Sequence, residues 1–336
     1  MLNQLLIKTP THENTATQTA IQQLKTSISE QIIGQETLIE RLLIALLADG
    51  HLLVEGAPGL AKTRAIKVLS EGIDGDFHRV QFTPDLLPAD LTGTEIYRPQ
   101  EGTFKFQPGP LFHNLILADE INRSPAKVQS ALLEAMAERQ ITVGSQTYQL
   151  PALFLVMATQ NPIEHEGTYP LPEAQLDRFL MHIRIDYPSA EHEKQIVHLA
   201  RTEARQPKQQ ITSTTHILSQ DTLFNARREI LDLYMADNLE EYMLQLVLAT
   251  RQPRRYGDDL ARWLQYGASP RASIALDRCA RAHAWLHNRD YVGPEDIQAV
   301  AYDILRHRVI LNYEAEAEGI TPDIFINALI TRIAVP

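Results

Sequence analysis

The stretch that decides the fold runs from residue 51 to residue 73 and reads HLLVEGAPGLAKTRAIKVLSEGI. It begins as an apolar run, passes through a turn that contains Gly56, and continues as a basic amphipathic pattern. A glycine-containing turn between a strand and a helix directs backbone N–H groups and the positive end of the helix dipole at one point, where phosphate is favoured. The sequence therefore predicts a strand, a phosphate-binding loop and a helix.

The loop departs from the usual pattern at one position. G-x-x-x-x-G-K-[ST] is matched by Gly56, Lys62 and Thr63, but Ala61 stands where the last glycine is expected. We expect Lys62 to reach the β- and γ-phosphates of a nucleotide and the Thr63 hydroxyl to be a Mg²⁺ ligand. Ala61 costs almost nothing at negative φ, but about 1–2 kcal/mol if its backbone is left-handed. The other predicted nucleotide-binding residues of the loop are Ala57, Pro58, Gly59 and Leu60.

Composition narrows the classes of protein that remain. The chain has 336 residues, of which 44% are hydrophobic and 22% charged, so it is long enough for two globular domains. Its single cysteine, Cys279, excludes an intrachain disulfide and is expected in an apolar helix face. No apolar run approaches the roughly 20 residues that a membrane span requires, and no secretory signal pattern opens the chain. We expect a cytoplasmic protein without membrane insertion, and the net charge of −11 argues against nucleic acid as a partner.

Five short apolar runs alternate with helical patterns up to about residue 188. Continuous apolar runs of this kind are typical of a parallel sheet with helices on both faces. The runs are HLLVEG, FHRVQF, NLILADE, LFLVMATQ and HIRIDY. Beyond them only helical periodicity is found, which predicts a second, all-α domain. We therefore divide the chain into a lead-in with a helix (1–30, the helix over 21–31), an α/β domain (31–190) and a helical domain (191–336).

Two adjacent carboxylates end the third apolar run. In NLILADEINR, Asp119 and Glu120 fall at the carboxyl end of a predicted strand, the edge at which open α/β sheets bind ligands. Asp119 is expected to hold Mg²⁺ through its water shell, and Glu120 to orient the water that attacks the γ-phosphate. The alternative is a solvated strand end without a catalytic role.

Three further polar residues are candidates for the same site. Asn161 ends the run LFLVMATQNP and could hydrogen-bond the γ-phosphate and the attacking water, although Asn-Pro alone often marks a turn. Arg178 ends a predicted helix just before the fifth strand, and Arg271 lies in the first turn of a helix in the second domain. An arginine at a helix amino terminus is unfavourable unless an anion lies near it. For Arg178 the alternative is an ion pair with Asp177 or Glu173, or solvation.

The motifs, in their order along the chain, resemble those of the MoxR family of AAA+ ATPases. They are GAPGLAKT, LILADEINR, ATQNP, LPEAQLDRF and GASPRA, and the resemblance runs from about residue 30 to the carboxyl terminus. Members commonly carry alanine at the position of Ala61. The resemblance implies a P-loop NTPase sheet of five parallel strands in the order 5-1-4-3-2, followed by a small helical lid.

The resemblance also implies roles for the candidate residues. Lys62 and Thr63 become the Walker A pair, Asp119 and Glu120 the Walker B pair, and Asn161 sensor 1. Arg178 becomes an arginine finger that is offered to a neighbouring subunit, and Arg271 becomes sensor 2, in contact with the nucleotide. Ile33 and Gly34, in the segment IIGQ, resemble the residues that contact adenine.

Two segments are similar to insertions of the helix-2-insert clade, to which MoxR proteins belong. They cover about 84–114 and, before sensor 1, about 139–155. Each is also readable as a hairpin, since Phe104 and Phe106 alternate across a pleat and ITVGSQTYQL turns at Gly144 and Ser145. Such hairpins often face a substrate in ring ATPases; the alternative is that the two phenylalanines pack the hairpin onto the body.

The activity implied is Mg²⁺-dependent ATP hydrolysis by a ring, expected to be hexameric, that remodels a protein client in a chaperone-like way. A partner with a von Willebrand factor A domain is common in the family. One alternative is a nucleic-acid motor of the helicase-like or nuclease-associated type, against which the acidic balance argues. Another is a nucleotide-controlled binding module with negligible turnover, against which Glu120 argues, because a switch needs no water-polarising carboxylate.

Overall fold

The computed structural model describes residues 16–162, 167–205 and 216–335. The first element, α1 (Ala16–Gln31), begins five residues earlier than the helix predicted over 21–31. Its buried residues include Ile21, Leu24 and Ile28, the apolar positions that predicted the helix. The polar residues before Ile21 extend this helix because Thr17 and Gln18 are themselves buried. In the described part of the chain, no helix is both long and apolar enough to cross a bilayer.

Five parallel strands form the central sheet. They are β1 (Leu52–Glu55), β2 (Phe77–Gln81), β5 (Leu115–Asp119), β8 (Leu155–Gln160) and β9 (Met181–Arg184). Their spatial order is β2-β5-β8-β1-β9, which confirms the predicted order of 5-1-4-3-2 when these five strands are counted along the chain. Each of the five apolar runs named from the sequence supplies one of them. β1 lies between β8 and β9, so that Leu52 is level with Met157 on one side and Met181 on the other.

Helices cover both faces of the sheet, as predicted. Successive residues of β5 illustrate this, since Leu115 and Leu117 belong to one hydrophobic core and Ile116 and Ala118 to the other. The first core is closed by α1, α2 (Glu36–Leu47), α3 (Lys62–Gly72) and α8 (Gln220–Leu231). The second is closed by α4 (Pro88–Thr92) and α5 (Ala126–Glu138). The remaining short elements of this region are η1 (Pro110–Phe112), η2 (Ile121–Arg123) and α6 (Glu173–Leu176).

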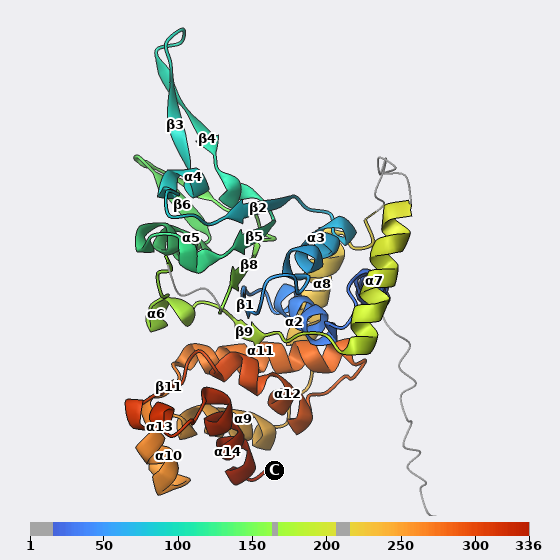
Figure 1. Cartoon of the computed structure of the whole chain (residues 1–336), viewed down its shortest axis with the longest axis vertical. Helices are drawn as coiled ribbons and strands as arrows, with labels where there is room; N and C mark the ends of the chain where they lie inside the picture. Colours follow the sequence, from blue (N-terminus) through green and yellow to red (C-terminus); the bar gives the residue numbers. More distant parts are fainter. Residues whose placement is uncertain (1–15, 163–166, 206–215, 336) are drawn as a thin grey trace, which may run out of the picture.

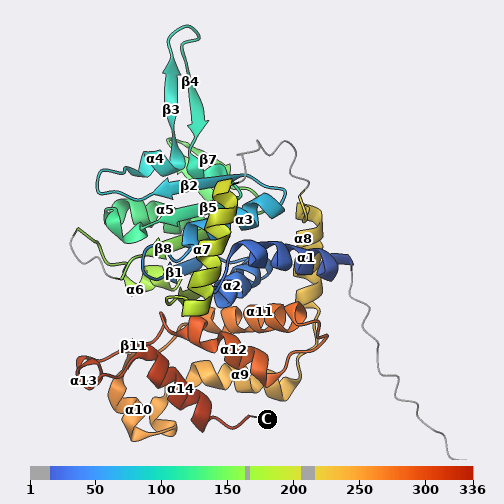
Figure 2. The same cartoon turned by 45° about the vertical axis from the view of Figure 1, so that its right-hand side comes forward.

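Two hairpins extend from the body beside β2 and β5. One is formed by β3 (Gly93–Arg98) and β4 (Thr103–Pro108) and projects far from the sheet; the other is formed by β6 (Gln140–Val143) and β7 (Gln146–Gln149) (Figures 1 and 2). Phe106 stacks on Tyr148 of the second hairpin with ring centroids 4.0 Å apart, whereas Phe104 is 67% exposed beside Tyr97. The alternative that the two phenylalanines pack the hairpin onto the rest of the protein is therefore right for Phe106 and wrong for Phe104.

The predicted helical domain (191–336), the lid, opens with α7 (Ala190–Arg205), which lies along the flank of the sheet domain (Figure 1). Its longest helix, α11 (Pro270–Leu286), lies directly beneath α2 in this view. The lid is not purely helical, because two short strands pair antiparallel within it. Cys279 is buried in α11, where burial raises the pKa of its thiol to about 12, so it is a core residue as expected. The other lid elements are α9 (Asp237–Ala249), η3 (Pro253–Arg255), α10 (Asp258–Trp263), β10 (Leu264–Tyr266), α12 (Pro294–Leu305), β11 (Ile310–Leu311), α13 (Tyr313–Ala317) and α14 (Pro322–Arg332).

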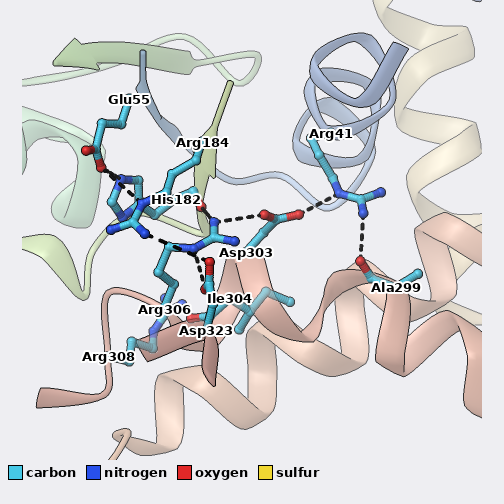
Figure 3. Close-up of polar contacts among 10 residues, drawn as sticks. All are labelled: Arg41, Glu55, His182, Arg184, Ala299, Asp303, Ile304, Arg306, Arg308 and Asp323. Carbon is cyan, nitrogen blue, oxygen red and sulfur yellow. Dashed lines mark hydrogen bonds and ion pairs between the residues drawn. The ribbon is translucent and has the colours of Figure 1, made fainter. Parts of the chain in front are cut away.

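A network of charged side chains joins the lid to the sheet (Figure 3). Arg306 of the lid donates from Nη1 to the carbonyl of His182 in β9 at 2.6 Å and from Nε to Asp323 at 2.7 Å. Asp303 accepts from Arg306 at 3.1 Å and, through its other oxygen, from Arg41 of α2 at 2.7 Å. Each buried charge therefore has an opposite charge and further hydrogen bonds, the condition under which buried ions are tolerated.

Arg306→Met is expected to destabilise the fold by about 3 kcal/mol, because it leaves Asp303 with one cation instead of two and removes a bond to β9. Arg262→Met is the matched control, since Arg262 pairs with Glu318 at 3.3 Å on the surface and such pairs contribute about 1 kcal/mol or less. Urea unfolding followed by far-UV circular dichroism measures both changes. Equal losses for the two variants would contradict a buried role for Arg306.

Candidate functional site

The phosphate-binding loop, the Asp-Glu pair and Asn161 line one cavity at the carboxyl edge of the sheet. The cavity has a volume of about 340 Å³. Its lining comes from three segments that are far apart in the sequence: residues 58–64, Asp119 with Glu120, and Asn161. The structure thus brings together Pro58, Gly59, Leu60, Ala61, Lys62, Thr63, Asp119, Glu120 and Asn161.

Of the two backbone conformations considered for Ala61, the structure has the left-handed, strained one. Ala61 has φ 58° and ψ 17°, which is left-handed, and it directly precedes α3. Gly59 is also at positive φ, 84°, and a Cβ there would meet nothing within 4 Å. The left-handed conformation of Ala61 therefore carries a conformational free-energy cost of about 1–2 kcal/mol. Glycine at the same position would not have this cost.

Lys62 lies across the loop. Its Nζ donates to the carbonyl of Gly56 at 2.5 Å and lies 3.4 Å from that of Gln160. Burial lowers the pKa of the Lys62 ammonium, and the carboxylates of Asp119 and Glu120 act in the opposite direction. The ammonium is thus held by neutral carbonyls at the edge of the cavity, where an anionic ligand would be a stronger partner.

Gly56 and Ala57 do not line this cavity. They line a neighbouring pocket together with Ile185 and Asp186 at the end of β9. A Cβ on Gly56 would collide with the Ile185 side chain and lie 3.0 Å from the Ile185 carbonyl oxygen. The glycine is therefore required for the close approach of the loop to β9, rather than for space around a phosphate.

Thr159 links the side chain of Asp119 to the backbone of Glu120. Its hydroxyl donates to Asp119 Oδ1 at 2.6 Å and accepts from the backbone N–H of Glu120 at 2.9 Å. Arg79 of β2 donates to the other oxygen of Asp119 at 2.7 Å. Asp119 is buried, and both of its oxygens are hydrogen-bonded. Sequence reasoning missed Thr159 and Arg79, because only the pairing of β8 and β2 with β5 brings their side chains within reach of Asp119.

Glu120 is held in an uncommon backbone conformation, with φ 58° and ψ 51°. Its carboxylate accepts from Gln81 Nε2 at 2.7 Å and from Arg123 Nη1 at 2.9 Å. A left-handed non-glycine residue persists only where its surroundings fix it, and such residues cluster at functional sites. Two donors and a fixed backbone thus aim this carboxylate at the cavity that the loop lines.

Ile33 lines a second, largely apolar cavity of about 110 Å³ beside the loop. Leu60 and Ala61 form one wall, and Ile196 and Leu199 of α7 another. An apolar slot next to a phosphate site suits a flat nucleobase. Gly34 does not line this cavity. It adopts φ 75°, and a Cβ there would lie 2.8 Å from His192 Nδ1, so the glycine serves the backbone turn and the approach of α7.

Arg178 and Arg271 lie away from these cavities. Both line a cavity of about 300 Å³ at the amino edge of the sheet, with residues that precede β1 and β9. The structure therefore does not bring Arg271 to the phosphate-binding loop of its own chain. Three more arginines line the same cavity: Arg139, Arg278 and Arg308.

The ion-pair alternative for Arg178 is not what the structure shows. Asp177 accepts instead from Arg308 Nε at 2.7 Å and from the Ser269 hydroxyl at 2.9 Å, and Arg271 Nη1 lies 3.9 Å from it. Within residues 16–162, 167–205 and 216–335, the Arg178 guanidinium makes no hydrogen bond or ion pair. Arg178 is thus a cation with no partner in the described part of its own chain.

Fold and cavities together define the class of protein, an AAA+ ATPase. The sequence profile of the ATPase family associated with various cellular activities (AAA) matches residues 51–181, and that of the AAA lid domain matches residues 261–329. The first match covers the loop and the sheet from β1 to the start of β9, and the second covers the part of the helical domain from α10 to α14.

The chain belongs to the MoxR family. It is 47% identical over 306 residues to Chaperone MoxR1 of Mycobacterium tuberculosis, an alignment that covers 91% of this chain and 79% of that one. It is 33% identical over 324 residues to Protein MoxR of Methylorubrum extorquens, covering 92% and 93%. A crystal structure of a protein from Cytophaga hutchinsonii, provisionally assigned as an ATPase, matches with a TM-score of 0.86 at 49% identity over 95% of this chain and 96% of that one.

Ala61→Gly is expected to raise the free energy of unfolding by up to about 1 kcal/mol, because glycine adopts φ 58° without the penalty that alanine bears. Ala200→Gly, at an exposed position in the interior of α7, is expected to lower it by about 0.5–1 kcal/mol. Urea denaturation without nucleotide measures both. A loss of stability in Ala61→Gly would contradict the left-handed assignment.

Proposed function

We propose that this protein hydrolyses ATP, with Mg²⁺ as cofactor, in the cavity at the carboxyl edge of the sheet. The observation that carries the proposal is the convergence of Lys62, Thr63, Asp119, Glu120 and Asn161 on that cavity. The residues fit the ligand. The loop is open at Gly59, and the apolar slot at Ile33 lies beside the loop. In the described part of the chain, the ammonium of Lys62 hydrogen-bonds to neutral carbonyls.

Each residue has a distinct task in this proposal. Lys62 binds the β- and γ-phosphates, Glu120 orients and polarises the attacking water, and Asn161 hydrogen-bonds that water and the γ-phosphate. Thr63 and Asp119 would hold Mg²⁺, which supplies positive charge to the phosphates. Because both Asp119 oxygens already accept hydrogen bonds, this carboxylate is suited to hold the ion through water.

We further propose that the chain assembles into a hexameric ring in which Arg178 and Arg271 act on the nucleotide of the neighbouring subunit. Both arginines line the cavity at the amino edge, opposite the edge that holds the loop of their own chain. The Arg178 guanidinium, which has no partner among the described residues, supports this role, since a cation offered to another subunit needs no internal partner. Arg271, 53% exposed, is equally accessible.

The proposed outcome of hydrolysis is chaperone-like remodelling of a protein client in the cytoplasm, with a von Willebrand factor A domain protein as partner. One relative is named a chaperone, and this name supports a protein, rather than a nucleic acid, as the substrate. The projecting β3–β4 hairpin, with Phe104 exposed, is an accessible surface for such a client. The net charge of −11 is a further reason to prefer a protein substrate to a nucleic-acid track.

Binding and chemistry are expected to separate in two variants. Lys62→Ala loses most of its ATP affinity, because the phosphates lose their cation. Glu120→Gln keeps ATP affinity but loses at least about 100-fold in turnover, because an amide cannot act as the general base. Calorimetry and a phosphate-release assay measure the two effects. Failure of Glu120→Gln to bind ATP would refute the division of roles.

Mixing experiments are expected to show that the site is shared between subunits. Arg178→Ala alone loses about 10³- to 10⁵-fold in rate if it removes the transition-state cation, and Lys62→Ala alone is also inactive. Co-assembly creates interfaces where an intact Arg178 meets an intact loop, so phosphate release recovers in part. Sizing first establishes that mixed rings form. Mixed rings no more active than the two parents would overturn the proposed trans-acting role.

A further inference from the structure

We propose a binding site for a divalent transition-metal ion of the Zn²⁺ type between α2 of the sheet domain and α11 of the lid. Its ligands are Glu40, His283 and His287. One ligand atom from each residue lies within 4.8 Å of the other two. None of the three contributes to the ATP cavity, so the site is separate from the proposed function.

The two histidines are spaced for one face of a helix. His283 lies in the last turn of α11 and His287 caps the helix, so they are four residues apart and their ring centroids are 4.4 Å apart. The carboxyl end of a helix carries partial negative charge, which favours a cation there. Histidines at this spacing, with a carboxylate from another helix, form a known zinc ligand set.

The ring of His283 is oriented by a buried carboxylate. Its Nδ1 lies 2.6 Å from Asp296 Oδ1, and Asp296 is fully buried on α12. Asp296 Oδ2 accepts from the backbone N–H of Gly293 at 2.8 Å, and Arg289 also contacts Oδ1, so this carboxylate only accepts. In the neutral ring the proton is then on His283 Nδ1, which gives Nε2 a lone pair to offer. A carboxylate behind a histidine is the usual outer partner of a zinc ligand.

The ring of His287 is oriented in the same sense by a backbone carbonyl. Its Nδ1 lies 2.9 Å from the carbonyl oxygen of His283, which can only accept, so Nδ1 again carries the proton. The lone pair on Nε2 then faces Glu40 Oε1 at 3.5 Å. Two acceptors face each other stably only with a proton or a cation between them. Zinc bonds of about 2.0–2.2 Å at tetrahedral angles separate two ligands by roughly 3.4 Å.

Glu40 is also held in place. Arg41 donates from Nη1 to Glu40 Oε2 at 2.6 Å, which leaves Oε1 for an ion. The nitrogen and oxygen ligands favour zinc over Mg²⁺ or Ca²⁺, which prefer oxygen alone. The His287 side chain is 42% exposed, so the ion has a route from solvent and water can fill the fourth position.

A bound ion would tie the lid to the sheet domain. Glu40 belongs to α2, which covers one face of the sheet, whereas both histidines belong to α11, which lies against α2 (Figure 1). Arg41 joins the same two units through Asp303 (Figure 3), so the ion would reinforce an existing contact. Zinc occupancy would then set how firmly the lid is held, independently of nucleotide.

The test is calorimetric titration of Zn²⁺ into the full chain, stripped with chelator, without nucleotide and with excess Mg²⁺ to occupy the carboxylates of the ATP cavity. We expect one ion per chain and a melting temperature that rises with zinc. His287→Gln and Glu40→Gln are each expected to weaken zinc binding at least about tenfold and to abolish the rise. His198→Gln, at an exposed position of α7, should bind zinc as the unmodified chain does.

Two results would overturn the site. One is the absence of stoichiometric zinc binding to the unmodified chain, which would leave a proton as the link between His287 and Glu40. The other is unchanged affinity in both His287→Gln and Glu40→Gln, which would place the ion elsewhere. Melting curves recorded before zinc is added show that each variant is folded. If one of the two variants misfolds, the zinc affinity of the other still tests the site.

Discussion

The parallel pairing of β1 with β8 on one side and β9 on the other is the constraint on which the site depends. It brings the ends of separate strands to one edge, so that the loop after β1, the carboxylates at the end of β5 and Asn161 after β8 face the same cavity. It equally brings the starts of the strands to the opposite edge, where Arg178 lies just before β9. A single sheet thus has one edge that carries the phosphate-binding loop and an opposite edge that carries a set of arginines, and the proposed ring is an assembly in which the two edges would meet.

Structural features that are encoded by adjacent residues could be predicted from the sequence. The five strands, the phosphate-binding loop, the position of Arg271 in the first turn of a helix and the burial of Cys279 all follow from runs of adjacent residues. Their order along the chain, together with the family resemblance, also predicted the order of strands in the sheet.

Features that depend on register or on tertiary contact were not predictable in this way. Thr159 links Asp119 to Glu120 only because β8 pairs with β5 in one register, and no local pattern marks that threonine. The left-handed backbone of Ala61 is fixed by the loop as a whole. Phe104 and Phe106 have the same pattern in the sequence, yet only Phe106 meets an aromatic partner on the second hairpin. Nor did any local pattern show that the placement of the lid puts Arg271 at the edge opposite the loop of its own chain.

The stacking of Phe106 on Tyr148 has a mechanical consequence. Each strand of the β3–β4 hairpin has six residues, which at about 3.3 Å per residue makes a rod roughly 20 Å long. The rod rests on the β6–β7 hairpin, and the chain runs from β7 directly into β8, the strand that ends beside Asn161. A tilt of about 10° at the base of such a rod moves its tip by roughly 3 Å. A small rotation at the contact between the two hairpins would therefore be amplified along the rod into a larger displacement of the exposed Phe104 side chain.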